Sequence, residues 1–202
     1  MNGGTHFGLV IGVCLSTCFA GVSQAEPESG LSAIQSFIQW EGQDEAPEIY
    51  GAVGFFADPT PPQWLVLTPV EGEEDVFREC IVKDGVVTAE RMFRKLPGQD
   101  LPSIPIRLED VKYDSGDAFL AAEEAAGSRK IKFESAHFQL RCREKGQEPV
   151  WMVSLLSGYH ISIGVVYVSA KSGDVIREKW QGEPSGKMYS STIELSKPVS
   201  GN

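Results

Sequence analysis

The chain has 202 residues, of which 42% are hydrophobic, and it carries a formal net charge of −10 at pH 7. An acidic protein of this kind disfavours nucleic acids and anionic membrane surfaces as partners. The hydrophobic content suffices for a folded core, and no segment after the first 25 residues is long and apolar enough to cross a bilayer.

Residues 1–25 have the pattern of a signal peptide. They contain no Asp, Glu, Lys or Arg, and an apolar run from Phe7 to Val22 ends in Ser23-Gln24-Ala25. Small residues at 23 and 25 suit a signal peptidase. An uncleaved anchor is the alternative, which the glycines at 8, 12 and 21 disfavour. We therefore expect export, a mature chain starting at Glu26, no stable membrane span after cleavage, and a periplasmic or secreted location.

Residues 26–108 are predicted to form a first α+β module. Ser29 is placed to cap a helix over Leu31–Trp40, whose apolar residues share one face. Strands are expected over 49–56 and from Trp64 onward, with a turn at 83–85. Prolines 97, 102 and 105 mark a stiff connection that ends the module after Leu108.

Residues 109–202 are predicted to repeat this plan. An Ala-rich helix over 118–126 is expected, capped by Ser115 or Asp117 and closed by Gly127. Strands are expected over 133–143, 150–156, 161–170 and 175–180. The fold class is therefore α+β, with two tandem modules, each one helix packed on an antiparallel sheet of about four strands.

Tryptophans relate the two halves. Trp64 and Trp151 are 87 positions apart, and the same offset places the first helix on the second and Phe93 on Trp180. A constant offset indicates an internal repeat. We expect Trp64, Trp151, Phe93 and Trp180 to be structural anchors that pack between helix and sheet.

Two cysteines, Cys80 and Cys142, follow the signal segment. An exported protein permits a disulfide between them. However, Cys142 continues the alternation of Phe138 and Leu140, which predicts that it points into a core. A disulfide and a pair of buried thiols remain equal alternatives.

Residues 115–180 resemble the PepSY family. The resemblance is carried by the helix up to Gly127, by Pro149-Val150-Trp151-Met152-Val153, and by the strand, turn and strand of residues 166–176. The family's usual Asp two residues before the Lys of this turn is Ser169 here. The resemblance implies a noncatalytic exported module, associated in the family with binding or restraining peptidases and with cell-envelope proteins.

No catalytic or metal-binding motif is visible in the sequence. His137 and His160 are the only histidines after residue 25, and the spacings HExxH, CxxC and GxSxG are absent. We therefore expect no cofactor and no catalytic site. Basic residues near the second helix, with those on the following strand, could form a docking patch or be ordinary solvated charges: Arg129, Lys130, Lys132, Arg141 and Arg143.

The leading functional hypothesis is an exported noncatalytic binding or peptidase-restraining module of the cell envelope, whose partner is a protein or peptide held by a sheet edge or an outward face. Alternatives are a hydrolytic enzyme that uses His137 or His160 as a base, and a structural envelope protein.

Overall fold

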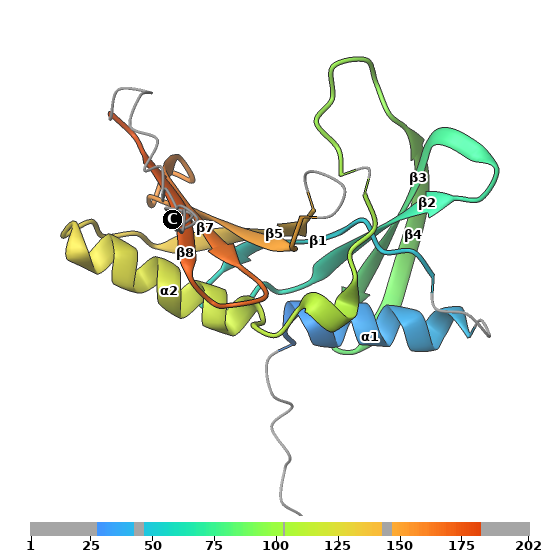
Figure 1. The fold of residues 1–202 in the computed structure, drawn as a ribbon, viewed down its shortest axis with the longest axis horizontal. Coiled ribbons are helices and arrows are strands. Elements are labelled where there is room, and N and C mark those ends of the chain that lie inside the picture. Colours follow the sequence, from blue (N-terminus) through green and yellow to red (C-terminus); the bar gives the residue numbers. More distant parts are fainter. Residues whose placement is uncertain (1–27, 43–46, 103, 143–146, 183–202) are drawn as a thin grey trace, which may run out of the picture.

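An open antiparallel sheet of eight strands and two helices form an α+β fold, as shown by a computed structural model that describes residues 28–42, 47–102, 104–142 and 147–182. Both helices lie on the same face of the sheet (Figure 1). The predicted signal peptide lies outside the described residues. The fold class is confirmed as α+β, with one continuous sheet through both halves.

The elements of each half follow one another in the same order, a helix and then four strands. The first half contains α1 (Gly30–Glu41), β1 (Gly51–Ala57), β2 (Trp64–Val70), β3 (Glu73–Lys83) and β4 (Val86–Arg94). A 3-10 turn (Leu108–Asp110) leads into the second half, with α2 (Ser115–Ser128), β5 (Ser135–Arg141), β6 (Val150–Leu156), β7 (Ser162–Ser169) and β8 (Val175–Trp180).

The sheet order is β4-β3-β2-β1-β5-β6-β7-β8, so β1 and β5 meet in the middle. Strand registers recur between the halves: Trp64 pairs with Val82 of β3, and Trp151 pairs with Val168 of β7. Both outer hairpins also shift register at matching places, after Ile81 and after Tyr167. The two halves therefore repeat each other in pairing geometry as well as in element order.

Helix α1 begins where its sequence predicts. The Ser29 side chain accepts a hydrogen bond from the backbone N–H of Ser32, and Gly42 ends the helix in the left-handed conformation. Its buried face, which includes Ile34 and Phe37, packs on the sheet. The cap and the amphipathic pattern are both confirmed.

Helix α2 begins at Ser115, one residue earlier than a Ser115 cap would place it and three residues earlier than an Asp117 cap would place it. Asp114 is the N-cap, while Asp117 closes a capping box by accepting from the backbone N–H of Asp114. The helix runs through Gly127 to Ser128. Small side chains at 118, 122, 125 and 126 are buried and allow a close approach to the sheet.

Trp64 and Trp151 are the centre of the core. Both are fully buried, and their rings meet edge to face with centroids 6.0 Å apart. The indole N–H of Trp64 donates to the carbonyl of Glu28, and that of Trp151 donates to the carbonyl of Tyr113. Each acceptor immediately precedes a helix N-cap, so the two tryptophans occupy equivalent settings.

Phe93 and Trp180 are not equivalent, in contrast to the prediction. Trp180 pairs with Gly164 and is buried on the helix side, whereas Phe93 pairs with Phe77 and stacks on it on the other face. The register instead makes Met92, paired with Arg78, the counterpart of Trp180. The turn between β7 and β8 is longer than the turn between β3 and β4. A constant offset of 87 therefore places Met92 on residue 179, one residue before Trp180, and matches Trp180 with Phe93, whose side chain lies on the other face of the sheet.

Cys80 and Cys142 are free thiols, both buried. Cys80 lies on β3 and Cys142 follows β5, with β2 and β1 between these strands. Three strand spacings correspond to about 14 Å along the sheet, well beyond the reach of a disulfide. The bridge is not formed in this fold, and the structure has the alternative of two buried thiols.

The N-termini of the two helices share one carboxylate. Oδ1 of Asp114 accepts from the backbone N–H of Leu31 in α1 and from that of Ser115 in α2. The Ser115 hydroxyl accepts from the N–H of Gly30. Because unpaired N–H groups and the positive helix dipole both favour an anion, this contact fixes the helices end to end at the middle of the sheet.

Candidate functional site

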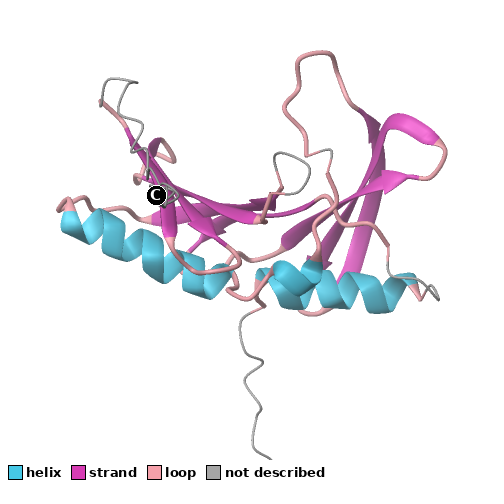
Figure 2. Cartoon of the chain, in the orientation of Figure 1, coloured by secondary structure: helices cyan, strands magenta, loops and turns pink. Residues whose placement is uncertain are grey.

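The sheet face opposite the helices is open and curves upward at both ends (Figure 2). No described helix covers it. The strand alternation places half-buried apolar side chains along its middle, among them Val53, Leu65, Ile81, Met152 and Val165. An apolar surface on a rigid, uncovered sheet is a candidate interaction surface.

Aromatic side chains gather at one end of this face. Phe55 and Phe56 at the end of β1 meet the His137 ring edge to face, with centroids 5.0 and 4.7 Å away. Phe56 also lies 4.9 Å from the ring of His160. Tyr159 and Ile161 flank His160 in the loop between β6 and β7. We call these six residues the aromatic end.

Large hydrophobic side chains of the aromatic end are exposed to solvent. Tyr159 is 88% exposed, Ile161 is 54% exposed, and Phe56 is 51% exposed. Single exposed apolar residues are normal on a protein surface, but a contiguous group of them indicates an interaction site. Aromatic residues are also the type most enriched at the energetic centres of protein interfaces.

Two residues of the aromatic end have backbone conformations that residues other than glycine seldom adopt. Phe56 has φ 55° and His160 has φ 57°, in the left-handed region. The register of β1 against β5 shifts between Gly54 and Ala57, so Phe56 lies in this irregularity. Such local strain is concentrated at functional sites in proteins.

The ring of His137 is desolvated by burial. This desolvation lowers its pKa below the ordinary histidine value, and the nearby His160 lowers it further. Its Nε2 atom is buried and has no hydrogen-bond partner. Ser154 is the cross-strand neighbour of His137, yet its hydroxyl donates no hydrogen bond to Nε2 of the ring. The ring therefore acts here as an aromatic surface.

The opposite end of the open face is covered by the described parts of the connection between the halves, residues 95–102 and 104–106. Pro102 lies against Gly51, and the N–H of Ile106 donates to the carbonyl of Ile49. Beneath this segment lies Arg141, the last residue of β5, which is only 4% exposed. Its Nη2 donates to Oδ2 of Asp100 at 3.0 Å.

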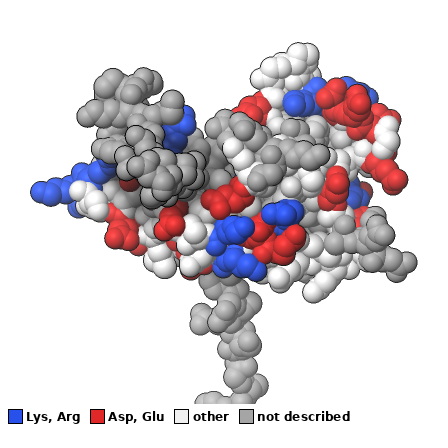
Figure 3. Space-filling model, in the orientation of Figure 1, with Lys and Arg blue, Asp and Glu red and all other residues white. Residues whose placement is uncertain are grey.

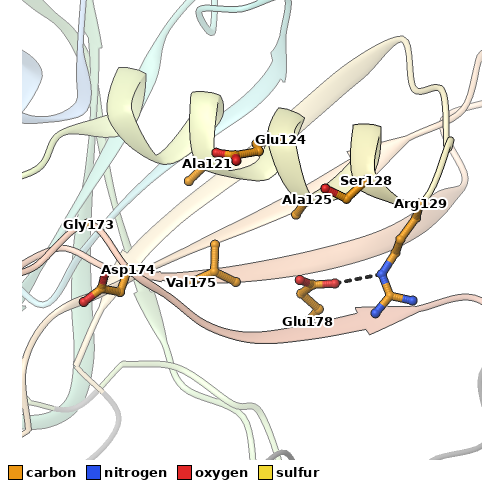
Figure 4. A pocket seen from close by; sticks show the side chains of 9 residues that line it. All are labelled: Ala121, Glu124, Ala125, Ser128, Arg129, Gly173, Asp174, Val175 and Glu178. Carbon is orange, nitrogen blue, oxygen red and sulfur yellow. Dashed lines mark hydrogen bonds and ion pairs between the residues drawn. The ribbon is translucent and has the colours of Figure 1, made fainter.

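A groove separates α2 from β8, because α2 packs mainly on β6 and β7 while α1 packs on all four strands of its half. Figure 4 shows Glu124 and Ala125 on the helix side and Val175 and Glu178 on the strand side. An ion pair of 2.8 Å from Arg129 Nε to Glu178 crosses it at one end. The groove is broad and open, with about 590 Å³ of space, and Glu178 also accepts a hydrogen bond from the indole N–H of Trp180.

The predicted basic patch is not gathered in one place. Arg129 lies over Trp180 and pairs with Glu178, with exposed Lys130 and Lys132 beside it before β5 begins. Arg141 lies at the far end of β5, roughly 20 Å along a strand of this length, and is buried. Arg143 lies outside the described residues. Figure 3 shows Lys and Arg side chains next to Asp and Glu side chains on the face in view. Lys171, for example, forms an ion pair with Asp110.

The described residues contain no group of three or more His, Cys, Asp or Glu side chains placed to hold a metal ion. Within the same ranges, no helix has the length and hydrophobicity needed to cross a membrane. Both cysteine thiols lie in the core, where desolvation raises the pKa of Cys80 to about 11 and also raises that of Cys142.

The sequence pattern singled out both histidines but not the phenylalanines that join them. Phe55 and Phe56 break the alternation of β1, since two neighbouring side chains there are exposed. Adjacent phenylalanines at a strand end were the available signal. The arginine beneath the connection had no such signal, because Arg141 continues an ordinary outward alternation with His137 and Gln139.

Comparison with protein-family models, with curated proteins and with solved structures finds no match to this chain.

Proposed function

We propose that this chain is an exported, noncatalytic binding protein of the cell envelope that takes a protein or peptide partner on the aromatic end of its open sheet face. The carrying observation is the exposed group of Phe55, Phe56, Tyr159 and Ile161 on a sheet end that no described helix covers. A restrained peptidase is the partner class that the PepSY resemblance implies.

Two further features support this proposal. The matching element order, registers and tryptophan settings support two tandem modules of one plan, of the PepSY-like kind. The burial of His137 Nε2 favours a binding role over a hydrolytic one that uses this atom, because a general base must be within hydrogen-bond reach of the proton it takes.

Site-specific photo-crosslinking in cells tests the proposal. A benzophenone side chain replaces Tyr159 in one variant and, as the control, Leu120, which is 63% exposed on α2. We expect a discrete protein adduct only from position 159, and its loss when Phe56→Ser is added. Equal adducts at both positions, or none at 159, contradict the proposal.

The peptidase arm and the enzyme alternative are tested with purified protein. We expect the wild type to reduce the activity of an adducted peptidase, and the Phe55→Ser/Phe56→Ser variant to lose that effect. A hydrolase would instead show turnover that His137→Ala or His160→Ala abolishes while the fold, followed by circular dichroism, is retained.

A further inference from the structure

The guanidinium of Arg141 is an incompletely satisfied buried charge. Its side chain is 5% exposed, its Nε is buried without a hydrogen-bond partner, and its one ion-pair partner among the described residues is Asp100. The Asp100 side chain is itself 74% exposed. A buried arginine is normally matched by several acceptors, since burying a charge without compensation is costly.

A cavity adjoins this arginine. It has a volume of about 200 Å³ and lies under the connection between the halves. Among the described residues that line the cavity, Lys95 and Arg141 are basic and Asp100 is the one carboxylate. The remaining lining residues are Gln99, Leu101, Pro102 and Cys142.

The geometry of the existing ion pair leaves one edge of the guanidinium half used. A small carboxylate or phosphate ion binds arginine through two parallel N–H···O bonds, for example to Nε and Nη2 together. Asp100 reaches Nη2 alone at 3.0 Å. Asp100 belongs to the connecting segment, which is tied to β1 by the hydrogen bond from the N–H of Ile106 to the carbonyl of Ile49.

We propose that this cavity binds an oxyanion, a carboxylate or phosphate group, which takes the place of the Asp100 carboxylate and engages Nε and Nη2 of Arg141 while Lys95 contributes a second positive charge. In the absence of ligand, Asp100 partly neutralises the arginine. The site is independent of the aromatic end and does not rest on the proposed function.

Titration of the mature chain with inorganic phosphate and, separately, with acetate tests the site. The readout is the ¹H–¹⁵N signal of Arg141 Nε–H, assigned by its loss in Arg141→Lys. We expect a saturable shift with at least one of the two ions. The ion that binds more tightly then distinguishes a phosphate site from a carboxylate site.

Asp100→Asn is the decisive variant, since it removes the competing charge from an exposed position. We expect it to bind the same ion several-fold more tightly. Glu73→Gln is the matched control, because it removes a carboxylate from another exposed ion pair, with Arg94, and should bind like the wild type.

Two results overturn the proposal: an Nε signal that does not saturate with either ion, or equal affinities of Asp100→Asn and Glu73→Gln. Both leave the crosslinking test at Tyr159 unaffected, so failure here is distinct from failure of the proposed function.

Discussion

The two ends of the open sheet face hold different chemistry at corresponding positions. Val53 pairs with Gln139 at the centre of the sheet, a difference of 86 positions (139 minus 53). The same difference relates Phe55 to Arg141 (141 minus 55). In one half this place holds an exposed aromatic ring, and in the other it holds a buried cation.

Arg141 is buried and Phe55 is exposed because the connection between the halves covers only Arg141. Residues 95–102 and 104–106 of this connection cross the face over Arg141 and leave the aromatic end bare. Figure 1 shows this connection rising from β4 on the side of the sheet away from the helices. Two halves with the same order of elements can therefore present two distinct surfaces when a single connection covers only one of them.

The largest effect on stability is expected from substitution of Trp64 and Trp151, and it tests whether the two halves are equivalent. Trp64→Ala and Trp151→Ala should each lower the free energy of unfolding by about 3–5 kcal/mol. Since the rings are in contact, the double variant should lose less than the sum. Urea unfolding of all three variants measures this, and a much smaller loss for one of them would break the equivalence.

A smaller effect of opposite sign is expected in the two corresponding turns. His160→Gly relieves a left-handed residue and should stabilise by up to about 1 kcal/mol, whereas Gly72→Ala should destabilise by about 1 kcal/mol. Gly72 has φ 76°, and a methyl group added there would meet no other atom within 4 Å, so its cost is conformational rather than steric. Thermal unfolding checks both, and changes of the same sign would contradict the assignment of strain to His160.

The aromatic end should also make stability depend on pH. The pKa of His137 is lower in the folded protein than the ordinary value of 6.5, so the unfolded chain binds the extra proton more readily. The stabilisation that His137 contributes as a neutral ring is therefore fully present above pH 6.5, and it is lost as the pH falls below 6.5 toward the lower pKa of the folded protein. We expect His137→Gln to flatten the loss of stability between pH 7 and 5, seen by urea unfolding; an unchanged slope would contradict it.

No effect is expected from oxidation of the thiols. Desolvation raises the pKa of both Cys80 and Cys142, and the attacking species in thiol chemistry is the thiolate. Alkylation at pH 8 should therefore proceed only in denaturant, and mobility on non-reducing gels should not change with reductant. Rapid labelling of the native protein would show that one thiol is accessible.

Local rules predicted the elements, and long-range packing decided what they did not predict. The Ser29 cap, the inward alternation at Phe138 and Leu140, and the strand over 175–180 follow from neighbouring residues alone. The placement of Phe93 failed because a longer turn shifts one register. Arg141 was expected outward and does lie on that face, but the connection that buries it comes from about 40 positions earlier.

The N-termini of both helices depend on the carboxylate of Asp114. This side chain lies in the second half, yet it accepts from the Leu31 backbone of the first helix as well as from Ser115. Any replacement must therefore suit two helix starts at once, so this position is expected to tolerate change less than Ser29, whose side chain accepts a hydrogen bond from its own helix.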